Sequence, residues 1–230
     1  MSDVRTHRWC QTAGFAAVAV PLLAIGSLLA DGWNLVPPAA DATDPAIVAY
    51  YTDHRTGLLV RSLGFALAAP LVLICGTAMA VHLCATGRAS SVRALVAGAG
   101  LALTALLWAV YAALNATVTL TIDAGAPTAQ PFRLALLLYA MLGPVIAAAV
   151  WATLPTGFSR PTNPLNALAT LTAACHLTLP VFALLPAITP PVQHIPLMLS
   201  VGLFCLWLPA SGLAMARSAD SPTLSPPPRH

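Results

Sequence analysis

A short polar segment between two apolar runs carries the side chains best suited to acid–base chemistry. Tyr50, Tyr51, Asp53 and His54 lie within five residues, and His194 lies in a later loop that we expect on the same side. A histidine beside an aspartate can take up and return a proton, so a membrane-embedded enzyme with an outer-face Tyr/His/Asp site is one hypothesis. Charged groups at a membrane surface are usually just solvated. We therefore assign no catalytic residue and expect a non-enzymatic role.

Arg61 is the charged side chain set most clearly inside a membrane-length apolar run. We place it about one turn inside the outer boundary of its helix, where a guanidinium can still reach water. Asp31, Asp53 and Asp123 are expected at matching depth as possible ion-pair partners. Arg61 thus predicts a structural anchor or ion pair, or else a binding site for an anion or carboxylated amphiphile at the outer mouth.

Polar and aromatic side chains recur at helical spacing within several apolar runs. Lipid offers them no hydrogen bonds, so stripes on neighbouring helices are expected to face one another. They could form hydrogen bonds that hold the helices together, or they could line a central cavity. The sequence is consistent with both. The clearest stripe comprises Thr104, Trp108, Tyr111, Asn115 and Thr119. The residues that we predict for ligand binding are Arg61, Tyr50, Tyr51, His54, Tyr111, Asn115, Trp108 and His176.

His82 and His176 raise the question of a haem, which their expected depths argue against. His176 falls near the middle of its run and His82 near the inner end of another, more than about 10 Å apart in depth. Axial ligands of one haem must lie at nearly the same level. The spacings match no zinc, phosphate-loop or nucleophile motif, so we predict no cofactor and no metal. The five cysteines are expected to be small buried side chains.

The composition requires a membrane protein. Of the 230 residues, 58% are hydrophobic and 7% are charged, against about 25% charged residues in soluble domains. Unpaired backbone groups cost several kcal/mol in lipid (of the order of their desolvation penalty), which favours an all-α bundle. We predict a single transmembrane domain over 1–216 and a disordered cytoplasmic tail over 217–230. The six predicted spans are about 11–30, 57–83, 94–121, 132–154, 165–188 and 195–216.

The segment DPAIVAYYTDHR predicts a short interfacial helix before the second span. Asp44 followed by Pro45 is typical of a helix start. Ile47, Tyr51 and His54 then fall on one face, with aromatic rings suited to the headgroup level. Prolines within five of the spans add expected kinks. These prolines are Pro21, Pro70, Pro144, Pro180 and Pro209.

The arginines predict the orientation. With the N-terminus inside, seven arginines lie on the cytoplasmic side and three on the outer half, as the positive-inside rule favours. We therefore expect a multi-pass protein of the bacterial cytoplasmic (inner) membrane with both termini cytoplasmic. The formal net charge of +3 is spread over short loops, which indicates no nucleic-acid partner.

The segment from Asp44 to Arg55 is similar to a "DPAxxAxYYxxHR" pattern found in a loose group of uncharacterised six-span bacterial membrane proteins. Asp44, Pro45, Tyr50 and Tyr51 match it, as do His54 and Arg55. The resemblance implies the six-span architecture and carries no activity. Our leading hypothesis is a bundle that binds or passes a small or amphiphilic molecule, with the lipid bilayer as its environment. The alternative, alongside the enzyme, is an accessory subunit with membrane-protein partners.

Overall fold

The computed structural model describes residues 3–30, 37–38, 41–87, 89–125, 128–154, 163–184 and 190–220. All regular structure in these residues is helical, as predicted. The elements are α1 (Asp3–Ala30), α2 (Asp44–Asp53), α3 (Arg55–Ala85), α4 (Ser91–Thr121), the 3₁₀ turn η1 (Ile122–Ala124), α5 (Ala129–Ala152), α6 (Pro164–Leu184) and α7 (Pro190–Asp220).

Five of the described helices are long and apolar enough to cross a membrane: α1, α3, α4, α5 and α7. This confirms the prediction of a multi-pass helical bundle in its coarse form. Helix α6 is not among the five, and it contains Asn166, His176 and Pro180 within 21 residues. The sixth crossing therefore stays a prediction, and residues 185–188 of that predicted span lie outside the described residues.

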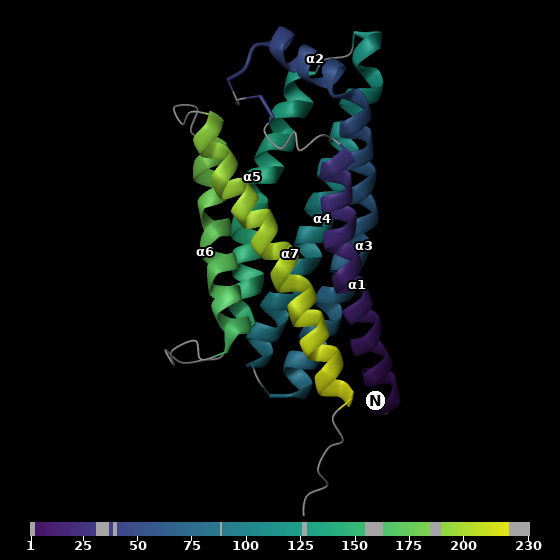
Figure 1. Ribbon diagram of the computed structural model, residues 1–230, viewed down its shortest axis with the longest axis vertical. Helices are drawn as coiled ribbons and strands as arrows, with labels where there is room; N and C mark the ends of the chain where they lie inside the picture. Colours follow the sequence, from purple (N-terminus) through teal and green to yellow (C-terminus); the bar gives the residue numbers. More distant parts are fainter. Residues whose placement is uncertain are drawn as a thin grey trace, which may run out of the picture.

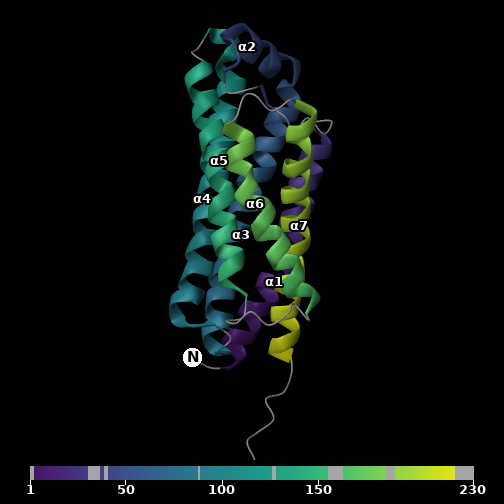
Figure 2. The same ribbon diagram turned by 90° about the vertical axis from the view of Figure 1, so that its left-hand side faces the viewer.

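The six long helices form a closed ring. Going round it, α1 packs on α3, α3 on α4, α4 on α5, α5 on α6, α6 on α7, and α7 returns to α1. The N-terminus and the end of α7 lie at the same end of the bundle in both views (Figures 1 and 2). This arrangement places every long helix against a common central axis, so each can present one face to the interior.

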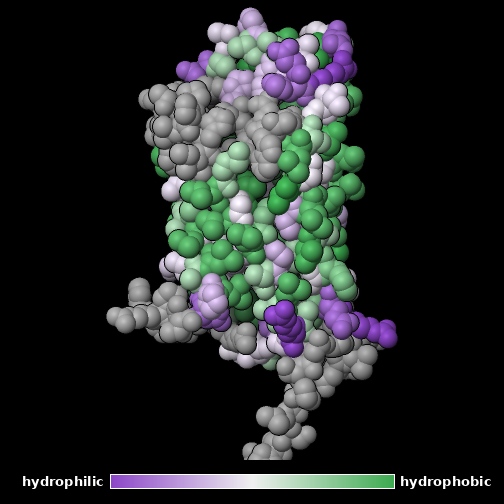
Figure 3. All heavy atoms as spheres, in the orientation of Figure 1, coloured by the Kyte–Doolittle hydropathy of each residue, from purple (hydrophilic) through white to green (hydrophobic). Residues whose placement is uncertain are grey.

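The bundle is apolar on its outside as well as its inside. Figure 3 shows one face of the molecule, which is mostly hydrophobic in its middle and has hydrophilic residues towards its two ends. Large apolar side chains such as Phe15, Leu22, Leu106 and Leu206 are exposed, whereas alanine and glycine fill many seams between helices. Such small residues let membrane helices approach closely when lipid supplies no hydrophobic drive.

The closest approach lies between α5 and α6, where Gly143 faces the backbone of His176. Pro180 has no N–H, so the carbonyl of His176 four residues earlier loses its helical hydrogen bond. A Cβ atom built on Gly143 would stand 2.3 Å from that carbonyl oxygen. Glycine is therefore required here because any side chain would push the two helices apart.

Helix α2 lies across the end of the bundle opposite the termini (Figure 1). Its N-cap is Thr43, one residue before the predicted Asp44, and Pro45 occupies the first turn. Ile47 and Tyr51 are buried on its inner face, as their spacing indicated. They pack against Leu58, Val118, Ile122 and Phe132 from α3, α4, η1 and α5. The helix thus covers the end of the ring over these three helices.

Candidate functional site

A cavity of about 80 Å³ lies inside the ring, beneath α2. A buried water needs about 10–15 Å³ on this measure, so the enclosed space holds several waters or part of an organic molecule. All seven α-helices contribute to its walls. Seven of the eight residues predicted for binding lie around it: Tyr50, Tyr51, Arg61, Trp108, Tyr111, Asn115 and His176.

The end of the cavity nearest α2 is polar. Arg61 of α3 is 5% exposed, and its Nη2 donates to the hydroxyl of Tyr50 at 3.3 Å. Tyr51 donates its hydroxyl hydrogen to Asn115 Oδ1 at 2.7 Å. Asn115 in turn donates from Nδ2 to the carbonyl of Tyr111 at 2.9 Å. A buried cation and two hydrogen-bonded tyrosines therefore converge where α2 closes the ring.

The middle of the cavity is walled by aromatic rings. Phe65 of α3 packs edge-on against Trp108 and Tyr111 of α4, at centroid distances of 5.1 and 5.8 Å. Tyr111 continues the wall to Tyr139 of α5 at 5.8 Å. These ring contacts are the offset and edge-to-face arrangements that aromatic pairs prefer. They give the cavity rigid apolar sides below a charged end.

His176 lines the far part of the cavity. Its Nδ1 lies 2.8 Å from the carbonyl of Thr172, so Nδ1 carries the hydrogen of the neutral ring and Nε2 is left as an acceptor. Its ring stands 5.9 Å from that of Phe204 on α7. A ligand reaching this depth would meet a hydrogen-bond acceptor set among apolar groups.

Tyr51 lies on α2, outside the predicted spans, and its burial changes the pKa of its hydroxyl. Desolvation raises the pKa of the Tyr51 hydroxyl, with smaller contributions in the same direction from Tyr111 and Tyr50, while the charge of Arg61 opposes them. The neutral phenol is thus the form that the fold stabilises. It serves as a hydrogen-bond donor to Asn115 and not as a base.

His54 does not join the cavity. It lies with Asp53 and Arg55 in a separate shallow depression on the surface, and its ring packs against Tyr50 at 5.2 Å. The side chain of His194 lies outside the described residues. The acid–base cluster considered from the sequence is therefore split, with Tyr51 buried on one side of α2 and Asp53 exposed on the other.

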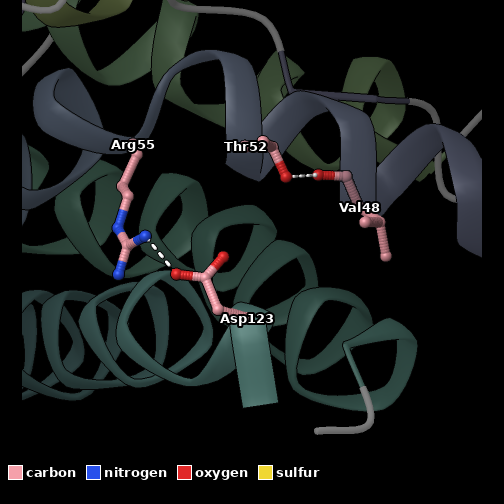
Figure 4. Close-up of polar contacts among 4 residues, drawn as sticks. All are labelled: Val48, Thr52, Arg55 and Asp123. Carbon is pink, nitrogen blue, oxygen red and sulfur yellow. Dashed lines mark hydrogen bonds and ion pairs between the residues drawn. The ribbon is translucent and has the colours of Figure 1, made fainter. Parts of the chain in front are cut away.

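Asp123 was one of three expected partners for Arg61, but it pairs with another arginine. It forms an ion pair with Arg55 at the start of α3 (Figure 4). Both side chains are largely exposed, so the pair adds little stability and mainly fixes α3 beside η1. The third expected partner, Asp31, lies outside the described residues.

Several wall residues were not among those predicted. Phe65, Phe132 and Tyr139 lie within apolar runs, where an aromatic residue looks like ordinary packing, so their types gave no separate signal. Phe204 lies at helical spacing from Ser200 and Trp207 but carries no polar group to mark it. Only a view of which helices are neighbours shows that these rings meet.

Among the described residues, no cluster of three or more His, Cys, Asp or Glu side chains could hold a metal ion. Comparison with protein-family models, curated proteins and solved structures finds no match to this chain. The resemblance carried by residues 44–55 accordingly stays a prediction.

Proposed function

We propose that this protein binds a small or amphiphilic molecule with an anionic head, a carboxylate for example, in its central cavity. The observation that carries the proposal is the convergence of a buried arginine and an aromatic-walled cavity inside one closed ring of helices. The head would lie near Arg61 and the apolar part between Phe65, Trp108 and Tyr139. This is a non-enzymatic role.

Charge supports an anion over a cation or a neutral molecule. Among the described residues that line the cavity, Arg61 is the only one with a formal charge. A guanidinium has five N–H donors and is well suited to carboxylate geometry. Low dielectric surroundings strengthen its attraction for an opposite charge. The Tyr50 hydroxyl accepts a hydrogen bond from Arg61 and so helps to hold the guanidinium at this end of the cavity.

The apolar walls support an organic tail in preference to a bare inorganic ion. Ligand sites in proteins are mostly apolar, with a few polar groups that set orientation. Below Arg61 the cavity is lined by rings and aliphatic side chains down to the level of His176 and Phe204. An inorganic ion would gain nothing from that surface, whereas a chain or ring would bury apolar area against it.

The binding test uses radiolabelled decanoate and the protein in lipid nanodiscs, measured by scintillation proximity with protein-free nanodiscs as background. We expect saturable binding that unlabelled decanoate displaces and that decyltrimethylammonium and decanol do not. Arg61→Gln should raise Kd about 10- to 100-fold, because a charge-assisted hydrogen bond contributes about 1.5–3 kcal/mol. Ala135→Leu should weaken binding by filling the cavity without touching the charge.

Arg133→Gln is the matched control, since Arg133 is an exposed arginine on α5 near the same end of the bundle. It should leave the Kd unchanged. The proposal fails if Arg61→Gln and Arg133→Gln bind alike, or if decyltrimethylammonium competes as well as decanoate. Should Arg61→Gln prove unstable, Ala135→Leu still decides the question.

For the setting of this site, we infer six crossings of the bacterial cytoplasmic membrane with both termini inside. The inference is supported by the arginine distribution and by α6 packing within the ring beside the five apolar helices. In this orientation α2 and the Arg61 end of the cavity face outwards. An anion would then enter from the outer leaflet or the outer solution.

No specific observation favours either alternative, the membrane enzyme or the accessory subunit. The enzyme hypothesis needs Asp53 and His54 in a pocket with a tyrosine, and they lie in a shallow surface depression instead. The accessory-subunit hypothesis needs a face that lipid does not satisfy, and the middle of the face shown in Figure 3 is mostly apolar.

A further inference from the structure

A second, larger cavity lies inside the ring at the end that carries the termini. It measures about 430 Å³ and is lined by α3, α6 and α7, by Thr153 just after α5 and by Asn163 just before α6. Its polar groups include His82, Asn163, Asn166 and Ser211. It shares no lining residue with the cavity beneath α2. The ring thus holds two cavities, one towards each end.

The two cavities come closest on α7. Cys205 lines the first cavity and Trp207 lines the second, a separation of about 3 Å along the helix axis. The corresponding gap is seven residues from Ile146 of α5 to its C-cap Thr153, and seven residues from Ala169 to His176 of α6, or about 10 Å. The partition, meaning the layer of side chains between the two cavities, is therefore thinnest at α7.

Two aromatic side chains of α7 stand at this partition. Phe204 and Trp207 have ring centroids 6.0 Å apart and are 3% and 1% exposed. Phe204 is also held between Trp108 of α4 at 6.0 Å and His176 of α6 at 5.9 Å. Phe204 is thus braced by α4 and α6, and Trp207 packs against Phe204. Each ring is a side chain that a rotamer change could move.

Helix α7, which carries these two rings, and helix α6 beside it each lack one backbone hydrogen bond near them. Pro209 cannot donate to the carbonyl of Cys205, and Pro180 cannot donate to the carbonyl of His176. Helices bend most easily at such points. The two interrupted positions lie close to Phe204 and Trp207, so a small change in helix angle there would move the rings apart.

We propose that the two cavities are the halves of one passage and that Phe204 and Trp207 form the gate between them. This rests on the proposed binding function and extends it from holding an organic anion to passing one across the membrane. The anion would leave Arg61, cross the aromatic layer when the gate opens, and enter the cavity bounded by His82, Asn166 and Ser211.

The test measures from which face each cavity can be reached, using native Cys205 as reporter. Cys10, Cys75, Cys84 and Cys175 are replaced by alanine, and a second protein carries Ser211→Cys with Cys205→Ala. The probe is sulfonatoethyl methanethiosulfonate, a permanent organic anion that does not cross lipid. It is applied to spheroplasts and to inverted vesicles. We expect Cys205 to react at least tenfold faster from the α2 face, and Ser211→Cys at least tenfold faster from the face of the termini.

Opening the gate should abolish this asymmetry. With Trp207→Ala, Cys205 should react from the face of the termini at least tenfold faster than before. Leu206→Ala is the matched control, because Leu206 is the neighbouring residue and is 61% exposed on the outside of the bundle. It should change neither rate. Phe204→Leu, which keeps an apolar side chain, provides a second test of the gate if Trp207→Ala does not fold.

The outcomes separate this proposal from the binding function. If decanoate binds in an Arg61-dependent manner but neither gate variant changes the reactivity of Cys205, the passage is wrong and the binding site stands. If the gate variants act as expected but decanoate does not bind, the anion assignment is wrong. Reaction of both reporters from the same face only would overturn the two-sided passage.

Discussion

At the scale of single residues, the polar end of the cavity is formed by the guanidinium of Arg61 and the hydroxyls of Tyr50 and Tyr51. An arginine well inside a span is costly, and Arg61 is buried with a tyrosine hydroxyl as one of its contacts. The bond from Tyr51 to Asn115 belongs to the same polar end. These contacts orient side chains around the cavity, so they link stability to binding.

The Tyr51–Asn115 bond gives a stability prediction. Tyr51→Phe keeps the ring but leaves Asn115 Oδ1 without its donor, which should lower the free energy of unfolding by about 1 kcal/mol. Thermal unfolding in detergent micelles measures it. Thr52→Ala is the control, because Thr52 is exposed on the same helix and its hydroxyl bonds only to the local Val48 carbonyl (Figure 4). Equal destabilisation by both changes would contradict the assignment.

The same variant should alter the response to alkaline pH. Because burial raises the pKa of Tyr51 in the folded protein, its stabilising effect is complete below the unfolded value of about 10. That effect is lost as pH rises above 10 towards the raised folded value. Between pH 9 and 11 the native chain should lose stability more steeply than Tyr51→Phe. The remaining tyrosines are common to both proteins and cancel in the comparison.

At the scale of elements, the helices could be predicted because their signals are local. Apolar runs bounded by arginine, glycine and proline placed each long helix, although α1 begins at Asp3 and not near residue 11. Ile47 and Tyr51 marked the inner face of α2. Neighbour relations were not predictable in this way. That Arg55 and not Arg61 pairs with Asp123 depends on how α3 is placed beside η1, and no spacing within one helix encodes that placement. The rings of Phe65 and Tyr139 meet around Tyr111 for the same reason.

The contact between α5 and α6 gives a prediction at this scale. Gly143→Ala would place a Cβ 2.3 Å from the His176 carbonyl oxygen, which is backbone and cannot rotate away. We expect a loss of about 1–3 kcal/mol in the free energy of unfolding, together with weaker decanoate binding because His176 lines the cavity. Thermal unfolding and the nanodisc assay measure the two effects.

Gly202→Ala is the matched control for this change. A Cβ at Gly202 in α7 meets nothing within 4 Å, and alanine is the better helix former by about 0.5–1 kcal/mol. It should therefore leave stability unchanged or raise it. If Gly143→Ala behaves like Gly202→Ala, close approach at Gly143 does not determine the packing of these helices.

At the scale of the whole molecule, the positions of the two ends of the ring bear on the number of membrane crossings. An odd number of crossings puts the two termini on opposite faces of a membrane, and an even number puts them on the same face. Five helices meet the length and apolarity needed to cross, yet the N-terminus and the end of α7 lie at one end of the bundle (Figure 1). Parity therefore supports the proposed crossing of α6, despite Asn166, His176 and Pro180. Its polar groups are tolerable because His176 faces the central cavity and Asn166 the second one.

Single-cysteine labelling tests this parity. Ser90→Cys between α3 and α4, Asn163→Cys before α6 and a tag at the C-terminus should all be reached from the same face. Ala124→Cys, at the end of η1, should be reached only from the other. Each is placed in a background with the five native cysteines replaced, and an impermeant maleimide is applied to spheroplasts and inverted vesicles. Since α7 crosses once, Asn163→Cys and the tag can share a face only if α6 also crosses. A tag on the face opposite Asn163→Cys would mean five crossings, and the ring could not then surround one passage.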